Sequence, residues 1–301
     1  MKDVLIIGSG PAGLSASIYA KRANLDVLVA EKEYLGTGQI AESAQVDNYL
    51  GIAGKSGYEL GETFRQHAEA FHVPFYEAEA IKLTRENGVW HTEFDNGETI
   101  QAKAVIYAAG SVHRRLQVPG EAALIGNGVS FCALCDGSLY QGKTAAVIGG
   151  GDTALDDALY LSNIAHKVYL IHRRNAFRGS DKSVLQIQNT ANIEAVLSAN
   201  VAEIIGSDQV EAIRLDNGRE IAVDGVFIAI GMVPQTNILK NIIEIDPYGY
   251  AVSDETGRTK APGLFVAGDV RTKTLRQIVT AVSDGANAAV SAVEYLKSLN
   301  D

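Results

Sequence analysis

Cysteine is scarce in this sequence, since only Cys132 and Cys135 are present among 301 residues. Two cysteines cannot build a disulfide scaffold. No apolar run approaches the ~18–20 residues that span a bilayer, which argues against a membrane protein. Basic residues are also fewer than acidic ones. The net charge of −10 argues against a nucleic-acid partner, because phosphate contacts need a basic face.

The amino terminus leaves no room for a signal peptide. Residues 1–8 run directly into an apolar strand and a glycine turn, without a cleavage site of small residues. We therefore expect the cytoplasm, where structural disulfides are rare. With 47% hydrophobic and 21% charged residues the chain is globular, and its length favours two domains. Its 30 glycines exceed average usage and indicate glycine-rich loops.

The sequence contains an internal duplication. The first copy has an apolar run, a glycine turn, a helical stretch and a second apolar run at 4–7, 8–13, 14–22 and 27–30. The second copy has them at 145–148, 149–154, about 155–162 and 168–171. Strand–turn–helix–strand units of this kind form parallel sheets. The pattern predicts an α/β fold with two Rossmann-like dinucleotide-binding domains.

Similar apolar strands that end in glycine close the two units, at 104–110 and 225–231. A further strand at 263–269 has no partner in the second unit, so the simplest topology returns it to the first domain. We therefore expect residues 114–241 to be inserted between the two parts of the first domain, 1–113 and 242–301. Ser111 to Arg115 and the stretch after Pro234 are the expected hinges.

The first glycine turn has the context of a dinucleotide site. Gly8, Gly10 and Gly13 follow a strand and open a helix, with Pro11 near its start. They permit the tight turn, the approach of a pyrophosphate and close helix–strand packing, while the helix N-terminus faces the phosphates. Glu31 lies 23 residues after Gly8, where it would accept hydrogen bonds from a ribose diol. This acid favours FAD; the alternative is a plain strand-to-helix turn.

The second turn differs at the position that selects the nucleotide. His172 lies 23 residues after Gly149, in place of the ribose-binding acid, and three arginines follow it. Guanidinium groups bind a 2′-phosphate that a carboxylate would repel. The turn is therefore predicted to hold NADPH, and a solvated basic turn is the alternative. Its predicted binding residues are Gly149, Gly151, Asp152, Thr153, His172, Arg173, Arg174 and Arg178.

The two cysteines form a Cys-x-x-C pair just before the first strand of the second copy. Such a pair can cycle between disulfide and dithiol, with one cysteine attacking a partner disulfide and the other facing the flavin. Asp136 adjoins Cys135 and could shuttle a proton. A zinc site is a weaker alternative, because four ligands are needed and no second cysteine pair or tight histidine pair exists. Two inert buried cysteines are a further alternative.

These residues resemble the low-molecular-weight bacterial thioredoxin reductases over nearly the whole chain. The resemblance is carried by segments 8–13, 132–137, 149–154, 172–174, 268–270 and 276–278 together with Arg178. It implies a homodimer with FAD and NADPH, an inserted domain that rotates between two poses, and thioredoxin or a thioredoxin-like protein as partner. Asp136 resembles the general acid of the family and Cys132 its outer, attacking cysteine.

The resemblance also implies further FAD residues. These are Gln39, Asn48, Gly268, Asp269, Arg276, Gln277 and Ile278, of which Asp269 resembles the ligand of the ribityl chain. Three positions depart from the family pattern. Thr37 replaces a glycine, Leu50 replaces a proline, and His113 stands where a proline is common.

The sequence thus predicts electron transfer from NADPH through FAD and the cysteine pair to a thioredoxin disulfide. Three alternatives remain. A ferredoxin-fed reductase of the same shape would have no use for a 2′-phosphate pocket, and a redox sensor would need no proton donor beside its cysteines. A flavoprotein of the NADPH:ferredoxin kind would lack the cysteine pair.

Overall fold

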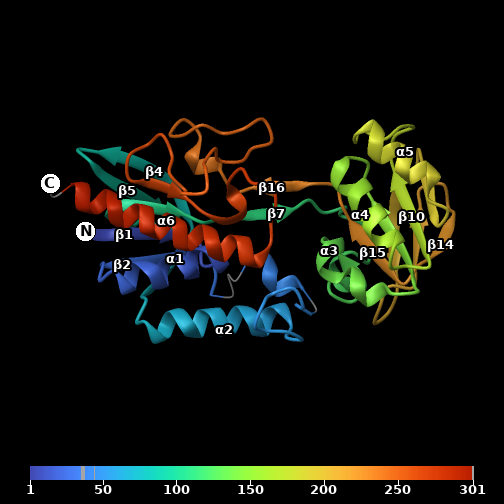
Figure 1. Cartoon of the computed structure of the whole chain (residues 1–301), viewed down its shortest axis with the longest axis horizontal. Coiled ribbons are helices and arrows are strands. Elements are labelled where there is room, and N and C mark those ends of the chain that lie inside the picture. The colour runs from blue at the N-terminus through green and yellow to red at the C-terminus, as the bar shows by residue number, and fades with distance from the viewer. Residues whose placement is uncertain (35–37, 44, 300–301) are drawn as a thin grey trace. The chain divides into compact units, whose positions relative to one another are not determined.

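The computed structural model describes residues 1–34, 38–43 and 45–299 (Figure 1), so Thr37 lies outside the described residues. The chain forms two compact units. The first comprises Met1–Ala41, Tyr58–Val112 and Val233–Asp301, and the second comprises Glu42–Gly57 and His113–Met232. The paired strands β7 (Ser111–His113) and β16 (Met232–Pro234) contain two of the points where the chain passes from one unit to the other.

The first unit is built on a seven-stranded sheet. Its strands are β1 (Lys2–Ile7), β2 (Val27–Glu31), β3 (Phe75–Glu77), β4 (Ala80–Glu86), β5 (Val89–Phe94), β6 (Thr99–Tyr107) and β17 (Leu264–Val266). The strands β3, β2, β1, β6 and β17 are parallel, whereas β4 and β5 form an antiparallel hairpin beside β6. Residues 99–102 of β6 pair with β5 and residues 105–107 pair with β17. The pairing of β17 confirms that the last strand returns to the first sheet.

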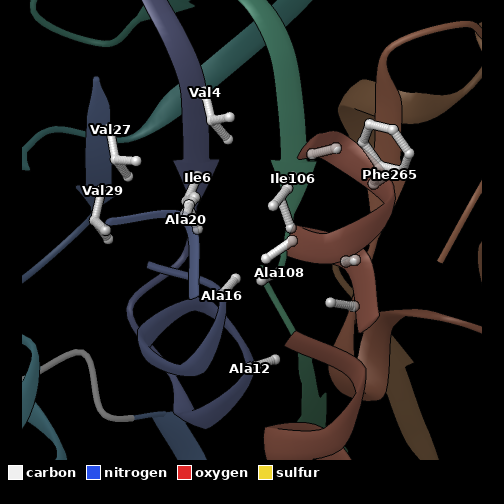
Figure 2. Close-up of a cluster of buried hydrophobic side chains, with 14 of the residues drawn as sticks. Val4, Ile6, Ala12, Ala16, Ala20, Val27, Val29, Ile106, Ala108 and Phe265 are labelled. Carbon is white, nitrogen blue, oxygen red and sulfur yellow. The ribbon is translucent and has the colours of Figure 1, made fainter. Parts of the chain in front are cut away.

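Small residues let the helices of the first unit approach its sheet. The helices are α1 (Pro11–Arg22), α2 (Gly57–Ala70) and α6 (Ile278–Ser298), with 3-10 turns η1 (Gly38–Glu42), η4 (Asn237–Leu239) and η5 (Gly268–Val270). Figure 2 shows the alanines of α1 in one buried cluster with Val4 and Ile6 of β1. A Cβ on Gly285 of α6 would lie 2.0 Å from the carbonyl oxygen of Ala12, so α1 and α6 pack at a glycine.

The second unit repeats the first in outline. A five-stranded parallel sheet has the order β11-β10-β9-β15-β8, and a separate antiparallel sheet has the order β12-β13-β14. The strands are β8 (Val129–Ser130), β9 (Thr144–Ile148), β10 (Lys167–His172), β11 (Ile193–Leu197), β12 (Val201–Ile205), β13 (Ala212–Leu215), β14 (Glu220–Ala222) and β15 (Gly225–Ile228). The helices are α3 (Ala133–Asp136), α4 (Asp152–Ser162) and α5 (Asp181–Asn189), with 3-10 turns η2 (Ala122–Leu124) and η3 (Gly137–Tyr140).

Backbone hydrogen bonds at the two glycine turns confirm the duplication. The N–H of Gly8 donates to the carbonyl of Ala30 (2.8 Å), and the N–H of Gly149 donates to that of Ile171 (3.0 Å). The order β3-β2-β1-β6 corresponds to β11-β10-β9-β15. The fold is therefore α/β with two dinucleotide-binding architectures, as the sequence predicts. Among the described residues, no helix is both long and apolar enough to cross a membrane.

Candidate active site

The first glycine turn is shaped by two close approaches and one open position. Gly8 has φ +109°, and a Cβ there would lie 2.4 Å from the carbonyl oxygen of Ala108. A Cβ on Gly13 would lie 1.8 Å from the carbonyl oxygen of Gly8. Gly10, in contrast, has open space within 4 Å of its Cβ position, and it precedes Pro11 as an N-cap without a side-chain hydrogen bond. The free N-terminus of α1 therefore fits a phosphate group.

The second turn has the same construction. A Cβ on Gly149 would lie 2.4 Å from the carbonyl oxygen of Ala229, and the third glycine position is Ala154. Gly151 has open space within 4 Å of its Cβ position and is the N-cap of α4 without a side-chain hydrogen bond. Asp152 does not cap α4; its Oδ1 accepts from the N–H of Ser180 (2.7 Å), and Thr153 follows in the exposed first turn. This helix N-terminus also fits a phosphate group.

Glu31 is buried at the end of β2 and already has a cationic partner. Nη1 of Arg65 donates to both of its carboxylate oxygens at 2.7 Å. The guanidinium carbon of Arg65 lies 3.3 Å from the centroid of the Phe75 ring. A carboxylate has about four lone-pair sites, so a ribose diol can still donate to Glu31. Arg65, on α2, belongs to no sequence motif and was not predicted.

At the equivalent end of β10 the carboxylate is replaced by an imidazole. His172 is buried and stacks on Phe177 (centroids 5.7 Å), and Gly150 faces its ring because a Cβ there would lie 2.3 Å from Nδ1. Burial lowers the pKa of His172, and the nearby arginines lower it further. Its Nε2 is buried without a hydrogen-bond partner in the described chain.

The three arginines after His172 are exposed. None of the guanidinium groups of Arg173, Arg174 and Arg178 forms an ion pair with the described residues. The backbone of Arg178 is fixed to the turn, since its N–H donates to the carbonyl of Gly150 (2.7 Å). An unpaired basic cluster beside an open helix N-terminus suits a phosphorylated nucleotide.

The C-terminal segment brings a second acid to the first turn. A Cβ on Gly268 would lie 2.9 Å from that of Ala12, so the turn before Asp269 lies against the start of α1. Asp269 Oδ1 is buried and has no partner among the described residues. Burial raises the pKa of Asp269. A buried acceptor without a donor fits a hydroxyl-bearing ligand.

The Gly268–Asp269 turn is held by a buried charge cluster that the sequence did not reveal. Asp284 Oδ2 accepts from the N–H of Gly268 (2.9 Å), from Nε of Arg271 (2.8 Å) and from Nζ of Lys273 (2.9 Å). Burial opposes the shift, but the hydrogen bonds from Arg271 and Lys273 lower the pKa of Asp284. The cluster fixes the backbone that carries Asp269.

The remaining flavin candidates are divided between the two units. The guanidinium carbon of Arg276 lies 3.9 Å from the centroid of the Tyr250 ring, and its Nε is buried without a partner in the described part of the chain. Gln277 is the N-cap of α6, which begins at Ile278. Gln39 of the first unit donates through Nε2 to the carbonyl of Ser111. Asn48 belongs to the second unit, in a loop closed by bridges Val46–Lys55 and Tyr49–Ile52 whose tip, Leu50, is 97% exposed.

Cys132 and Cys135 form a disulfide around the short helix α3, with Cα atoms 5.2 Å apart. Cys132 is the N-cap of this helix, and its Sγ accepts from the N–H of Cys135 (3.1 Å). A Cβ on Gly137, after α3, would lie 3.0 Å from Tyr160 of α4. The disulfide loop therefore packs directly against α4, the helix that follows the second glycine turn. No group of three or more histidine, cysteine, aspartate or glutamate side chains within the described ranges could hold a metal ion.

Asp136 lies beside the disulfide in a site suited to proton transfer. Burial raises its pKa, opposed by a hydrogen bond from Ser130 Oγ to Oδ2 (2.5 Å). Its Oδ1 is buried and unpaired with any described residue. Ser130 also accepts from the N–H of Cys132 (3.1 Å), so it connects the acid to the disulfide. Ser130, too, was not predicted.

Two open glycine turns, a disulfide loop packed against α4 and an adjacent protonatable acid define a class of protein: an oxidoreductase that couples dinucleotides to disulfide chemistry. The comparisons with known proteins agree, because residues 2–285 match the family described as pyridine nucleotide-disulphide oxidoreductase. The chain belongs to this family, whose members use a flavin and a nicotinamide nucleotide.

The relatives include named thioredoxin reductases. The chain is 39% identical to that of Treponema pallidum (99% of this chain, 98% of the relative) and 38% identical to that of Listeria monocytogenes (99% and 95%). It is also similar to the crystal structure of thioredoxin reductase from Streptococcus pyogenes, with 37% identity, a TM-score of 0.94 and 99% of each chain covered. These findings confirm the resemblance to thioredoxin reductases stated from the sequence.

Proposed function

We propose that this protein is an NADPH-dependent thioredoxin-disulfide reductase. The observation that carries the proposal is the Cys132–Cys135 disulfide beside Asp136, whose Oδ1 is buried without a partner among the described residues, on a unit with its own dinucleotide turn. Named thioredoxin reductases that match nearly the full chain support it.

We assign FAD to the first unit and NADPH to the second. The first unit offers the open Gly10 position, Glu31, and the unpaired groups of Asp269 and Arg276, which suit the phosphates and hydroxyls of FAD. The second unit offers the open Gly151 position and three exposed arginines, which suit a 2′-phosphate. The inserted unit is accordingly the NADPH domain.

The net reaction balances without another reductant. NADPH, a proton and oxidised thioredoxin give NADP⁺ and reduced thioredoxin. A bound flavin supplies two-electron transfer between a nicotinamide and a disulfide. At the disulfide, the S–S bond takes up two electrons and two protons, and Asp136 is placed to deliver one of these protons.

The two cysteines have separate roles in this proposal. The thiolate of Cys132 attacks the thioredoxin disulfide, and the released thioredoxin sulfur takes up a proton. Cys135 then attacks Cys132 of the mixed disulfide, which restores the disulfide and releases reduced thioredoxin. We further propose a homodimer in the cytoplasm, in keeping with the family resemblance.

The test uses the purified yellow protein without oxygen. NADPH alone should bleach the flavin, NADH should do so poorly, and thioredoxin should then restore the colour. Cys135→Ser should accumulate a mixed disulfide between Cys132 and thioredoxin, whereas Cys132→Ser should form none. Bleaching only by reduced ferredoxin would reject NADPH as donor, and absence of the mixed disulfide would reject the cysteine roles.

A further inference from the structure

The residue before Cys132 is held by the segment through which the chain enters the second unit. The ring of His113 stacks on the ring of Phe131, with centroids 4.7 Å apart and an interplanar angle of 20°. The guanidinium carbon of Arg115 lies 4.4 Å from the centroid of the same ring. We call His113, Phe131 and Arg115 the Phe131 clamp.

The clamp is anchored on the side of the entering segment. Arg115 donates through Nη2 to the carboxylate of Glu42 (2.6 Å). Arg114 lies between His113 and Arg115 in the sequence, and its N–H donates to the carbonyl of Gly231 (3.0 Å), immediately before β16. His113 itself is the last residue of β7, the strand that pairs with β16. The clamp is therefore tied to two points where the chain passes between the units.

On its other side the clamp reaches the disulfide loop. Phe131 lies between Ser130, which is buried and bonded to Asp136, and Cys132, the N-cap of α3. Because Ser130 Oγ also accepts from the N–H of Cys132, the backbone on both sides of Phe131 is fixed. Burial and the charge of Arg115 lower the pKa of His113 to about 4, so its ring is neutral near pH 7 and stacks without a desolvated charge.

We propose that His113 and Arg115 are positioning residues that act through Phe131 to hold Cys132 in place. This inference rests on the proposed function for its role in turnover. It explains what a histidine does at a position where the family commonly has proline. It also assigns a physical connection between the strands that lead into the inserted unit and the attacking cysteine.

The first experiment needs neither thioredoxin nor turnover. The flavoprotein is reduced with dithiothreitol, and alkylation of Cys132 by iodoacetamide is followed by mass spectrometry. His113→Ala and Phe131→Leu should raise the rate about fivefold, because loss of the ring contacts releases the loop. His113→Phe, which keeps a stacking ring, should restore the wild-type rate. An unchanged rate in Phe131→Leu, or a rate in His113→Phe equal to that of His113→Ala, would overturn the proposal.

A double-mutant cycle tests the coupling within the clamp. The effect of His113→Ala should disappear in the Phe131→Leu background, and an undiminished effect would contradict the clamp. The matched control is His67→Ala, which removes a ring beside Phe71 in the first unit (5.6 Å) and should leave the Cys132 rate unchanged. Parallel circular-dichroism melts of each variant show whether it is folded.

Steady-state kinetics distinguish a clamp that positions Cys132 from one that forms part of a docking surface for thioredoxin. With thioredoxin as substrate, His113→Ala should lower kcat about fivefold at an unchanged KM. A higher KM at an unchanged kcat would instead make the clamp part of a docking surface and overturn the proposal. If no variant or wild-type protein reduces thioredoxin, the proposed function fails, while the alkylation result still decides whether the clamp holds Cys132.

Discussion

The two dinucleotide units have the same turn but opposite charged surroundings. In the first, Glu31 ends β2 and is paired with Arg65, while in the second, His172 ends β10 and is followed by exposed, unpaired arginines. Both turns leave the middle glycine open and cap their helix without a side chain. On the proposed assignment, the backbone of each turn provides the phosphate site, and the residue at the end of the next strand, with its neighbours, selects FAD or NADPH.

Each unit also contains an acid with one buried, unpaired oxygen. Asp269 Oδ1 and Asp136 Oδ1 have no partner in the described residues, and burial raises the pKa of both. They differ in what lies beside them: Asp269 follows the Gly268 turn against α1, whereas Asp136 adjoins the disulfide. We therefore expect an aspartate with a raised pKa and an unpaired Oδ1 to bind a ligand in the first unit and to transfer a proton in the second.

Exchanging these two acids for asparagine should give the largest effects. Asp136→Asn should lower kcat about 100-fold or more and retain the flavin, because a general acid is lost. Asp269→Asn should release the flavin while Cys132 of the reduced protein still alkylates normally. Since the pKa of Asp136 is raised, wild-type activity should decline as pH rises through it, and Asp136→Asn should lack this decline. Steady-state rates against pH and the flavin content per chain measure these outcomes, and equal flavin loss in both variants would contradict the division of roles.

Removing the arginine cluster should affect only the second unit. Replacement of Arg173, Arg174 and Arg178 by glutamine should raise the KM for NADPH about 100-fold. Each lost hydrogen bond to a charged group weakens binding by about tenfold or more. The KM for NADH should stay the same. Lys182→Gln, an exposed cation on α5, is the control for general loss of charge. A parallel rise of both KM values would show that the cluster does not read a 2′-phosphate.

Adding one methyl group to each glycine turn should show which cofactor that turn binds. Gly10→Ala and Gly151→Ala add a Cβ to open space at negative φ, so neither should disturb folding. Gly10→Ala should weaken FAD binding about tenfold and leave the KM for NADPH unchanged, and Gly151→Ala should do the reverse. FAD titration of the apoprotein and NADPH kinetics measure the pair. If either variant weakens both cofactors, the two turns are not independent.

The smallest expected effect is a change in stability with pH. The pKa of Asp284 is lowered in the folded state from its usual 3.8. Its contribution to stability is therefore complete above that value and is lost as pH falls through the folded pKa. Asp284→Asn should be less stable than wild type at pH 7, and the difference in melting temperature should narrow toward pH 3. Asp208→Asn, at an exposed site, should show a constant difference, and a constant difference for Asp284→Asn would contradict this role.

Local sequence signals predicted the duplicated units, because glycine spacing and apolar runs report backbone geometry directly. They also predicted the return of β17 to the first sheet and the proximity of Asp136 to the cysteines. The antiparallel strands β4–β5 and β12–β14 were not predicted, since these strands are short and lack a motif.

The supporting side chains were not predicted for a different reason. Arg65 reaches Glu31 across 34 residues, and Asp284 reaches the N–H of Gly268 from one helix to a separate turn. Neither contact leaves a spacing pattern, because it depends on tertiary packing rather than on helix or strand periodicity. Ser130 is nearer to the cysteines, but a single serine has too many ordinary roles to stand out.

The pairing of β7 with β16 has a consequence for protein engineering. A segment that leaves and re-enters its host through neighbouring strands has its two ends close together, which is the geometry of a tolerated domain insertion. The stretch between these strands makes up most of the second unit, to which Glu42–Gly57 also belongs. On the proposed assignment, transplanting both segments from a relative should exchange the nucleotide specificity and the cysteine pair in one step.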